Sequence, residues 1–125
     1  MKNMGDVICD ALEKLNLEDV YIGMFQRPES LAGNASSIVL IALNPPSQSA
    51  FASNKFLQRH FTYQINVESS DYYETKRLAR EVEKVLLDLN FFQQSGGLDE
   101  YFEGTKRYVD ARTYRGSAQL YDIEY

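Results

Sequence analysis

The chain has 125 residues, a single cysteine and a formal charge of −5 at pH 7, and one domain of this size can bury a core of its own. The lone Cys9 excludes an intramolecular disulfide framework, and no apolar run approaches the ~20 residues of a membrane span. The acidic balance argues against a protein that grips nucleic acid over a broad surface. We therefore expect one soluble domain, residues 1–125, in which any contact with DNA is local or non-adhesive.

The N-terminal residues 2–15 have the periodicity of an amphipathic helix. The apolar side of this helix consists of Met4, Ile8, Ala11, Leu12 and Leu15. Acidic residues within the segment distinguish it from a signal peptide. Residues 19–25 then alternate as a first strand, and residues 26–37, which include proline, glycine and asparagine, are typical of a loop.

The run Ser-Ser-Ile-Val-Leu-Ile-Ala-Leu at residues 36–43 predicts a central strand, because it is short, apolar and rich in β-branched residues. The two prolines that follow Asn44 end the strand, since proline cannot donate a hydrogen bond to a sheet. We expect a long loop over about residues 44–57. It is either a disordered insertion or an arm, bearing the aromatic residue Phe51, that contacts a partner.

The stretch from Gln58 to Phe92 organises the domain. Its first part predicts a strand with one buried face, formed by Phe61, Tyr63, Ile65 and Val67. After Ser69 the apolar residues recur at three- and four-residue steps, which predicts an amphipathic helix. The helical stripe consists of Leu78, Val82, Val85, Leu86 and Leu89. Asp71 and Glu74 have the spacing of a capping box, in which each side chain bonds to the backbone of the other residue.

The residues after this helix predict turns and short extended segments. Asn90-Phe91-Phe92 indicates a tight exit with two rings to bury, and Ser95-Gly96-Gly97 indicates a turn. Residues 98–106 are either a short edge strand or a structured loop.

Residues 107–115 alternate as a further strand with an amphipathic outer face. This outer face consists of Tyr108, Asp110, Arg112 and Tyr114. Gly116 is predicted to turn the chain, and residues 117–125 form a last strand or an extended tail that docks on a neighbour, because their apolar side chains are costly to leave in water. The whole pattern predicts an α+β fold, with a mainly antiparallel sheet of four to five strands and two helices packed on it.

The sequence offers no arrangement of residues that indicates catalysis. His60 is the single histidine and lies at the start of a predicted strand, and no serine stands in a nucleophile elbow. One histidine and one cysteine make a zinc site improbable, and the acidic residues 99–103 lack the spacing of a calcium loop. We expect no enzymatic activity, no catalytic residues, no metal and no cofactor.

Arginine and tyrosine alternate near the C-terminus, and these two residue types are enriched at protein interfaces. An RNA-binding sheet also interleaves bases and aromatics, but the motif typical of such a sheet is absent. The candidate residues for an oligomer or partner interface are Phe51, Arg59, Arg107, Tyr108, Arg112, Tyr114, Arg115, Tyr121 and Tyr125.

The layout resembles the small tail terminator and head–tail joining proteins of long-tailed bacteriophages and prophages. The resemblance is in Phe-Thr-Tyr-Gln-Ile-Asn-Val-Glu-Ser at residues 61–69, the charged helix ending in Leu-Asn-Phe-Phe, and Arg-Tyr-Val-Asp-Ala-Arg-Thr-Tyr-Arg-Gly at residues 107–116. It implies a hexameric ring that caps the tail tube and docks to the head connector, with DNA passing through. It also implies a virion protein of the tail or neck, assembled in the host cytoplasm with the major tail protein and connector proteins as partners.

The sequence leaves other roles open. The chain could be a different head–tail connector or a minor tail component, and a nucleic-acid-binding module is the third alternative, disfavoured by the charge balance.

Overall fold

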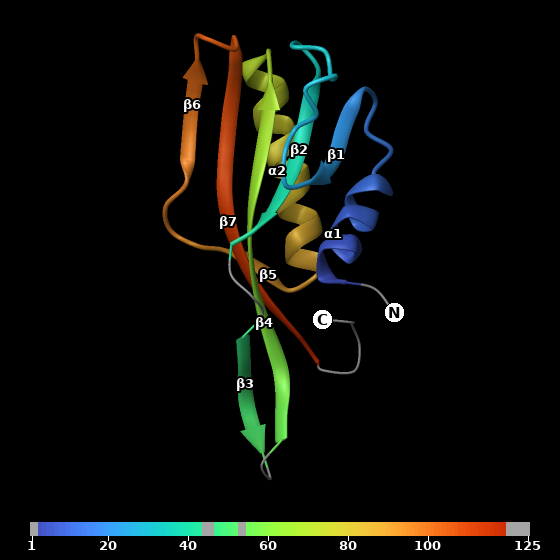
Figure 1. Ribbon diagram of the computed structural model, residues 1–125, viewed down its shortest axis with the longest axis vertical. Helices are drawn as coiled ribbons and strands as arrows, with labels where there is room; N and C mark the ends of the chain where they lie inside the picture. Colours follow the sequence, from blue (N-terminus) through green and yellow to red (C-terminus); the bar gives the residue numbers. More distant parts are fainter. Residues whose placement is uncertain (1–2, 44–46, 53–54, 120–125) are drawn as a thin grey trace.

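The computed structural model describes residues 3–43, 47–52 and 55–119, and it describes the side chains of residues 3–43 and 59–117. Along the chain the elements are α1 (Met4–Glu13), β1 (Val20–Met24), β2 (Ser36–Ala42), β3 (Ser47–Ala52), β4 (Lys55–Ser69), α2 (Tyr72–Asp88), β5 (Phe91–Gln93), β6 (Leu98–Phe102) and β7 (Arg107–Gln119). The predicted α+β class is confirmed (Figure 1).

The strands form one seven-stranded sheet with the order β1-β2-β4-β7-β5, in which β3 pairs with β4 and β6 pairs with β7. The pair β1–β2 is parallel and the other pairs are antiparallel. The mainly antiparallel sheet is thus confirmed, but it has more strands than the four to five expected. The short strands β3 and β5 account for the difference, because neither carries a clear alternation of apolar residues. Of the two alternatives for residues 98–106, the structure has the short edge strand, β6.

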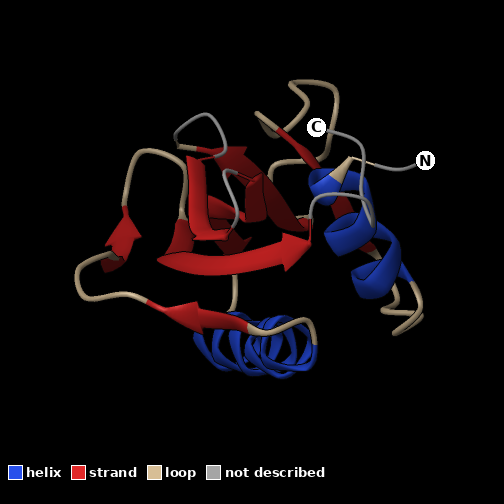
Figure 2. Ribbon diagram, turned by 90° about the horizontal axis from the view of Figure 1, so that it is seen from below, coloured by secondary structure: helices blue, strands red, loops and turns tan. Residues whose placement is uncertain are grey.

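One face of the sheet carries the core. The predicted inward residues of β4, from Phe61 to Val67, are all buried, and they meet the predicted stripe of α2, in which Leu78, Val82 and Leu86 are buried. Helix α1 packs beside α2 against β1 and β2. In Figure 2 α2 lies against one face of the curved sheet, with α1 at the side of the same layer. The predicted contact between the inward face of β4 and the apolar stripe of α2 is therefore confirmed.

The start of α2 matches half of the predicted capping box. The Asp71 carboxylate accepts a hydrogen bond from the Glu74 backbone N–H at 3.3 Å, which satisfies one of the free amides of a helix terminus. The Glu74 carboxylate does not return to Asp71. It bonds to Arg77 at 2.6 Å, while the Asp71 N–H donates to the Ser69 hydroxyl. The reciprocal bond was a wrong prediction because a charged partner one turn along the helix competes for Glu74.

The segment predicted as a long loop at residues 44–57 is instead mostly a β-hairpin. Strand β3 pairs with the first part of β4, in a register that sets Ser47 opposite His60 and Ala52 opposite Lys55. This hairpin, which we call the arm, projects beyond the helix-covered body of the molecule (Figure 1). The residues of β3 are mostly small and polar, so the sequence does not show the alternation of a strand there. The strand forms because its backbone pairs with the long β4.

Gly116 was predicted to turn the chain and lies instead inside β7, opposite Phe61 of β4 and Phe91 of β5. A Cβ atom at this position would lie 2.6 Å from Cγ of Phe91 and 2.9 Å from the backbone oxygen of Asn90. The glycine therefore serves close packing of β5 on β7, and β7 runs on to Gln119. The tail beyond it, residues 120–125, lies outside the described residues.

Candidate interaction surfaces

Of the residues predicted from the sequence to form an interface, those whose side chains the structure describes do not gather on one surface. Tyr114 is 1% exposed and belongs to the core, so the predicted outer face of β7 is in fact the face beneath α2. Arg107 bonds to Glu68 at 3.1 Å, and Arg115 is exposed. Arg59 is half-buried and has interactions of its own. Phe51, Tyr121 and Tyr125 lie outside the residues whose side chains are described.

Arg112 belongs to an ion-pair network between β7 and α2 that is centred on the buried Asp110. Asp110, on the same face of β7, accepts hydrogen bonds from Arg112 at 2.8 and 3.1 Å and from Lys76 of α2 at 3.0 Å. Lys76 also bonds to Asp99 of β6, and Arg112 reaches Glu83 of α2 at 3.4 Å. The network ties α2 to two strands, and it gives Arg112, whose side chain is 23% exposed, a structural role.

The network also sets the protonation of Lys76. Burial by itself would lower the pKa of this amine, but its hydrogen bonds to Asp99 and Asp110 and their negative charges outweigh burial and raise the pKa. The amine is therefore firmly charged at neutral pH, as the buried Asp110 carboxylate requires.

Four tyrosine rings form a row that joins the start of α2 to β7 and β6. Tyr73 contacts Tyr72 with ring centroids 5.4 Å apart, Tyr72 contacts Tyr108 at 5.5 Å, and Tyr108 contacts Tyr101 at 4.7 Å. The side chains of Tyr73, Tyr101 and Tyr72 are 79%, 48% and 43% exposed. Sequence analysis singled out Tyr108 alone, because the other three belong to α2 and β6 and only folding brings them together.

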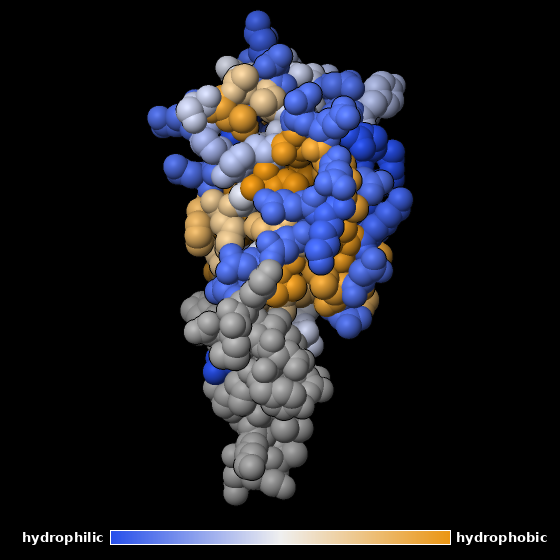
Figure 3. Space-filling view, turned by 90° about the vertical axis from the view of Figure 1, so that its right-hand side faces the viewer, coloured by the Kyte–Doolittle hydropathy of each residue, from blue (hydrophilic) through white to orange (hydrophobic). Residues whose placement is uncertain are grey.

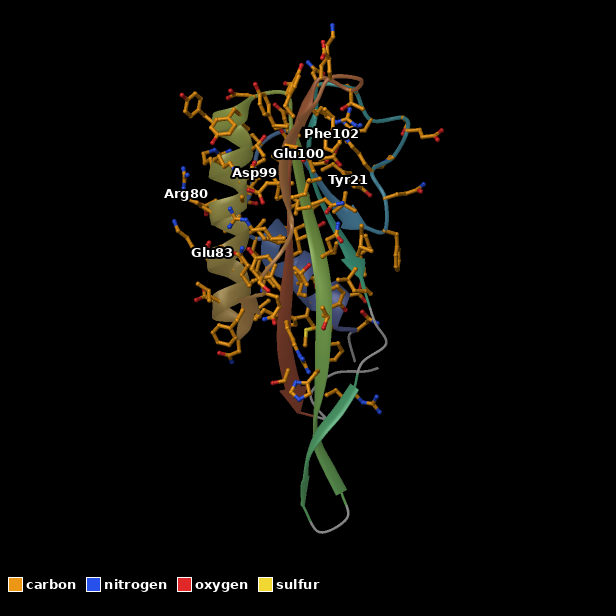
Figure 4. The ribbon with its side chains drawn as sticks, turned by 90° about the vertical axis from the view of Figure 1, so that its left-hand side faces the viewer. Tyr21, Arg80, Glu83, Asp99, Glu100 and Phe102 are labelled. Carbon is orange, nitrogen blue, oxygen red and sulfur yellow. The ribbon has the colours of Figure 1, made fainter. Side chains whose placement is uncertain are left out.

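Strand β6 continues this exposed surface. All five of its residues are exposed, and among the described strands it pairs with β7 alone. Figure 4 shows Asp99 on the side of α2, and Glu100 and Phe102 on the opposite side of the strand. We call the surface formed by Tyr72, Tyr73, Glu100, Tyr101, Phe102 and Glu103 the aromatic edge. It combines exposed rings with carboxylates, and exposed apolar patches of this kind mark protein contacts.

The sheet face opposite the helices mixes neutral polar and apolar side chains at its centre, because the register sets Val39 and Ala111 beside Asn66. Gln64 and Asn66 of β4 are half-buried there and joined by a hydrogen bond of 2.8 Å. The loop between β1 and β2 crosses the end of this face, held by Arg107, which donates to the Gly33 carbonyl at 3.1 Å, and by Arg27, which donates to the Ala35 carbonyl at 3.0 Å. The face offers hydrogen-bonding groups without a strong charge.

The side of the molecule that carries α1 and β1 mixes apolar and charged surface (Figure 3). An open, shallow groove lies between α1 and the end of α2, lined in part by Val7, Ala11 and Leu89 with Asp10 and Glu13 at its rim. Asp10 already has an interaction within the chain. Lys14 and Asn16 also line the groove, which is therefore apolar and mixed in charge.

No group of three or more histidine, cysteine, aspartate or glutamate residues in the described part of the chain is placed to hold a metal ion. The same described residues include no helix that is long and apolar enough to cross a membrane.

Cys9 is half-buried on α1 and packs against the core. Burial, followed by the negative charges of Glu13, Asp6 and Asp10, raises the pKa of this thiol to about 11. Because the thiolate is the reactive form, we expect Cys9 to be alkylated by iodoacetamide at pH 8 roughly twentyfold more slowly than a free thiol, after allowance for the greater nucleophilicity of a more basic thiolate. Mass spectrometry of time points measures this rate, with the urea-unfolded chain as the control. Equal rates in the folded and unfolded chain would contradict the packing role of Cys9.

The described residues thus define an α+β sheet domain with two helices on one face, an exposed aromatic edge at one end and a hairpin arm at the other (Figure 1). No protein-family model and no curated protein matches the sequence. Among solved structures the fold is similar to a chain of the structure described as "Virion of native gene transfer agent (GTA) particle". The TM-score is 0.55 at 15% sequence identity, and the match covers 86% of this chain and 84% of that chain. A likeness at this identity shows a shared fold.

Proposed function

We propose that the chain is a structural subunit of a phage-like virion, and specifically a tail terminator that caps the tail tube and joins it to the head connector. The observation that carries the proposal is the fold similarity to a chain of a gene transfer agent virion, which extends over most of both chains. The layout of residues 61–69 and 107–116 points to the same class. In this role the protein is not an enzyme and needs no cofactor.

The proposed assembly is a ring, hexameric in line with the tail terminator resemblance. The arm and the aromatic edge are two different surfaces at opposite ends of the molecule, as far as it is described, and they suit head-to-tail contacts. Such contacts form a ring when the rotation from one subunit to the next adds up to a full turn. The acidic balance of the chain suits a channel that DNA crosses without adhering. The proposed partners are further copies of the chain, the major tail protein and the connector proteins of the head, in a virion assembled in the host cytoplasm.

Deletion of the gene from the particle-producing genome tests the proposal. Without a terminator nothing stops growth of the tail tube, so electron microscopy should show filled heads that are separate from tails of abnormal and variable length. Supply of the intact chain from a plasmid should restore joined particles. Tails of normal length beside unjoined heads would assign the chain to another connector position, and normal infectious particles would overturn the proposal.

The arm gives a narrower prediction. Replacing residues 49–58 by Asn-Gly closes the hairpin at the Gln48–Arg59 pair, with a turn suited to two-residue hairpins. Because the core lies in the helix-covered body, we expect the shortened chain to fold, with a far-ultraviolet circular dichroism spectrum close to that of the parent. We expect it to fail to complement the gene deletion, with at least a hundredfold loss of infectious or transducing particles. Normal complementation would show that the arm has no role in assembly.

A further inference from the structure

We infer that the arm of one subunit docks on the aromatic edge of a second copy, where β3 adds to β6 as an extra strand. This inference rests on the proposed ring and names its contact. It assigns a role to two exposed features of the fold: a hairpin that leaves the body, and a strand whose residues are all exposed.

The aromatic edge has the composition of a protein-binding surface. Phe102 is 40% exposed on one side of β6, and the exposed rings of Tyr72, Tyr73 and Tyr101 lie on the other side. Tyrosine and phenylalanine are enriched in interface cores, because they bury a large area at a low cost in side-chain entropy. Carboxylates border these rings: Glu100 and Glu103 are exposed, while Asp99 is neutralised by Lys76. The surface therefore fits an extended segment that is apolar and basic.

The arm has that chemistry. From Ser30 to Val67 the chain has no aspartate or glutamate, whereas the arm carries Lys55, together with Phe51 and Phe56. In a chain of net charge −5, this makes the arm the complement of the aromatic edge, and opposite charges steer two surfaces together and fix their register.

The backbone geometry is complementary as well. Among the described strands, β3 pairs only with β4 and β6 only with β7, so each has one edge without a strand partner. The six residues of β3 and the five of β6 have nearly the same length. An unpaired edge is a template for addition of another strand, and the backbone hydrogen bonds supply affinity.

The donor must be another chain. The arm projects from one end of the molecule and β6 lies toward the other end in both side views (Figures 1 and 4), so an arm cannot reach the aromatic edge of its own chain. The other sheet edge, β1, is a poorer partner for β6, because Glu18 and Asp19 precede it and would face the carboxylates of β6. A head-to-tail contact of arm and aromatic edge repeats from subunit to subunit and closes as a ring.

Cysteine cross-linking between two versions of the full chain tests the contact. In a Cys9→Ala background one version carries Ser49→Cys in β3 and the other, distinguished by an affinity tag, carries Glu100→Cys in β6. The two versions are co-expressed in cells that produce particles, and purified particles are treated with a short bismaleimide. We expect a covalent heterodimer on denaturing gels, confirmed by mass spectrometry of the linked peptides. The matched control replaces Glu100→Cys by Asp88→Cys, an exposed position at the C-terminal end of α2, and should give less than a tenth of that product.

The outcomes separate this inference from the proposed function. Particles that contain the chain as a ring but yield no Ser49–Glu100 product overturn the docking while leaving the terminator role intact. A link from position 100 to a different virion protein also overturns the docking, because that protein would then bind the aromatic edge. Particles without the chain overturn both proposals.

Charge reversal provides a second test that does not depend on cross-linker reach. Glu100→Lys with Glu103→Lys should reduce complementation at least tenfold, with thermal unfolding unchanged because both side chains are exposed. Lys55→Glu in the same chain should restore part of the loss, and a triple variant no better than the double variant would overturn the pairing of these charges.

Discussion

Replacing Phe91 by alanine is expected to lower the free energy of unfolding by about 3–5 kcal/mol, the usual cost of removing a fully buried aromatic ring. Phe91 has no exposed surface, and it anchors the three-residue strand β5 at the end of α2, with its ring centroid 6.3 Å from that of Tyr63. Since domains are stable by only about 5–15 kcal/mol, the variant should lose a large part of its stability. Urea titration followed by circular dichroism measures the change.

Its neighbour provides the matched control. Phe92→Ala removes a ring that is 56% exposed, and it should cost less than about 1 kcal/mol, since surface substitutions have small effects. The sequence Asn90-Phe91-Phe92 was predicted to bury both rings, and only one is buried. Equal losses for the two variants would contradict this assignment.

Gly116 couples to Phe91 in a way that a double-mutant cycle can detect. Gly116→Ala places a methyl group against the Phe91 ring and should cost about 1–3 kcal/mol through overpacking. In the Phe91→Ala background the ring is gone, so the added methyl group should cost at least about 1 kcal/mol less. Additive losses would mean that the clash is with the backbone oxygen of Asn90 instead of the ring.

Replacing Asp110 by alanine is the second large effect, and we expect a loss of about 3 kcal/mol. The Asp110 side chain is 3% exposed and accepts hydrogen bonds from both Lys76 and Arg112. Without it, two positive groups face each other in a largely buried site with only Asp99 and Glu83 left as partners. Asp99→Asn is the control: its side chain is 59% exposed, and an exposed ion pair is worth about 1 kcal/mol or less. Equal losses for the two aspartates would contradict the central position of Asp110.

The same network predicts a dependence on alkaline pH. The folded chain raises the pKa of Lys76, so its contribution is complete below the ordinary lysine pKa of about 10.4 and is lost as the pH rises through the higher folded value. Cys9, Tyr63 and Tyr114, whose pKa values are raised mainly by burial, contribute losses of the same sign. Urea titrations between pH 8 and 11 should therefore show falling stability, with a smaller fall in Asp110→Ala. An unchanged slope in the variant would contradict the role of the network.

The core could be predicted because its elements are strongly periodic. In β4 every second residue from Phe61 to Val67 is buried, and in α2 the stripe from Leu78 to Leu86 faces the sheet. In both elements one face is clearly apolar, and any arrangement that exposes this face to water has a higher free energy than one that buries it. The short strands β3, β5 and β6 lack that contrast, so each is defined by backbone pairing with a longer strand, β4 for β3 and β7 for the other two.

The inward face of β7 shows where the pattern was insufficient. Its two faces, one with Val109 and Thr113 and the other with Asp110 and Tyr114, are both mixed in polarity, so alternation established a strand without choosing a side. The register with β4 makes the choice, because it sets Tyr114 opposite the buried Tyr63 and Asp110 opposite the buried Val67. The charges then become tolerable only because α2 presents Lys76 and Glu83 at matching positions.

The sequence by itself determined the α+β class, the central strand and helix, and the acidic balance, since composition and local periodicity are properties of the chain alone. Only the tertiary structure decided which tyrosines form a continuous row and which arginine joins the ion-pair network beside α2. The contact of Tyr72 with Tyr108 and that of Arg112 with Glu83 join residues distant in the sequence, and such contacts follow from the strand order and register of the whole sheet.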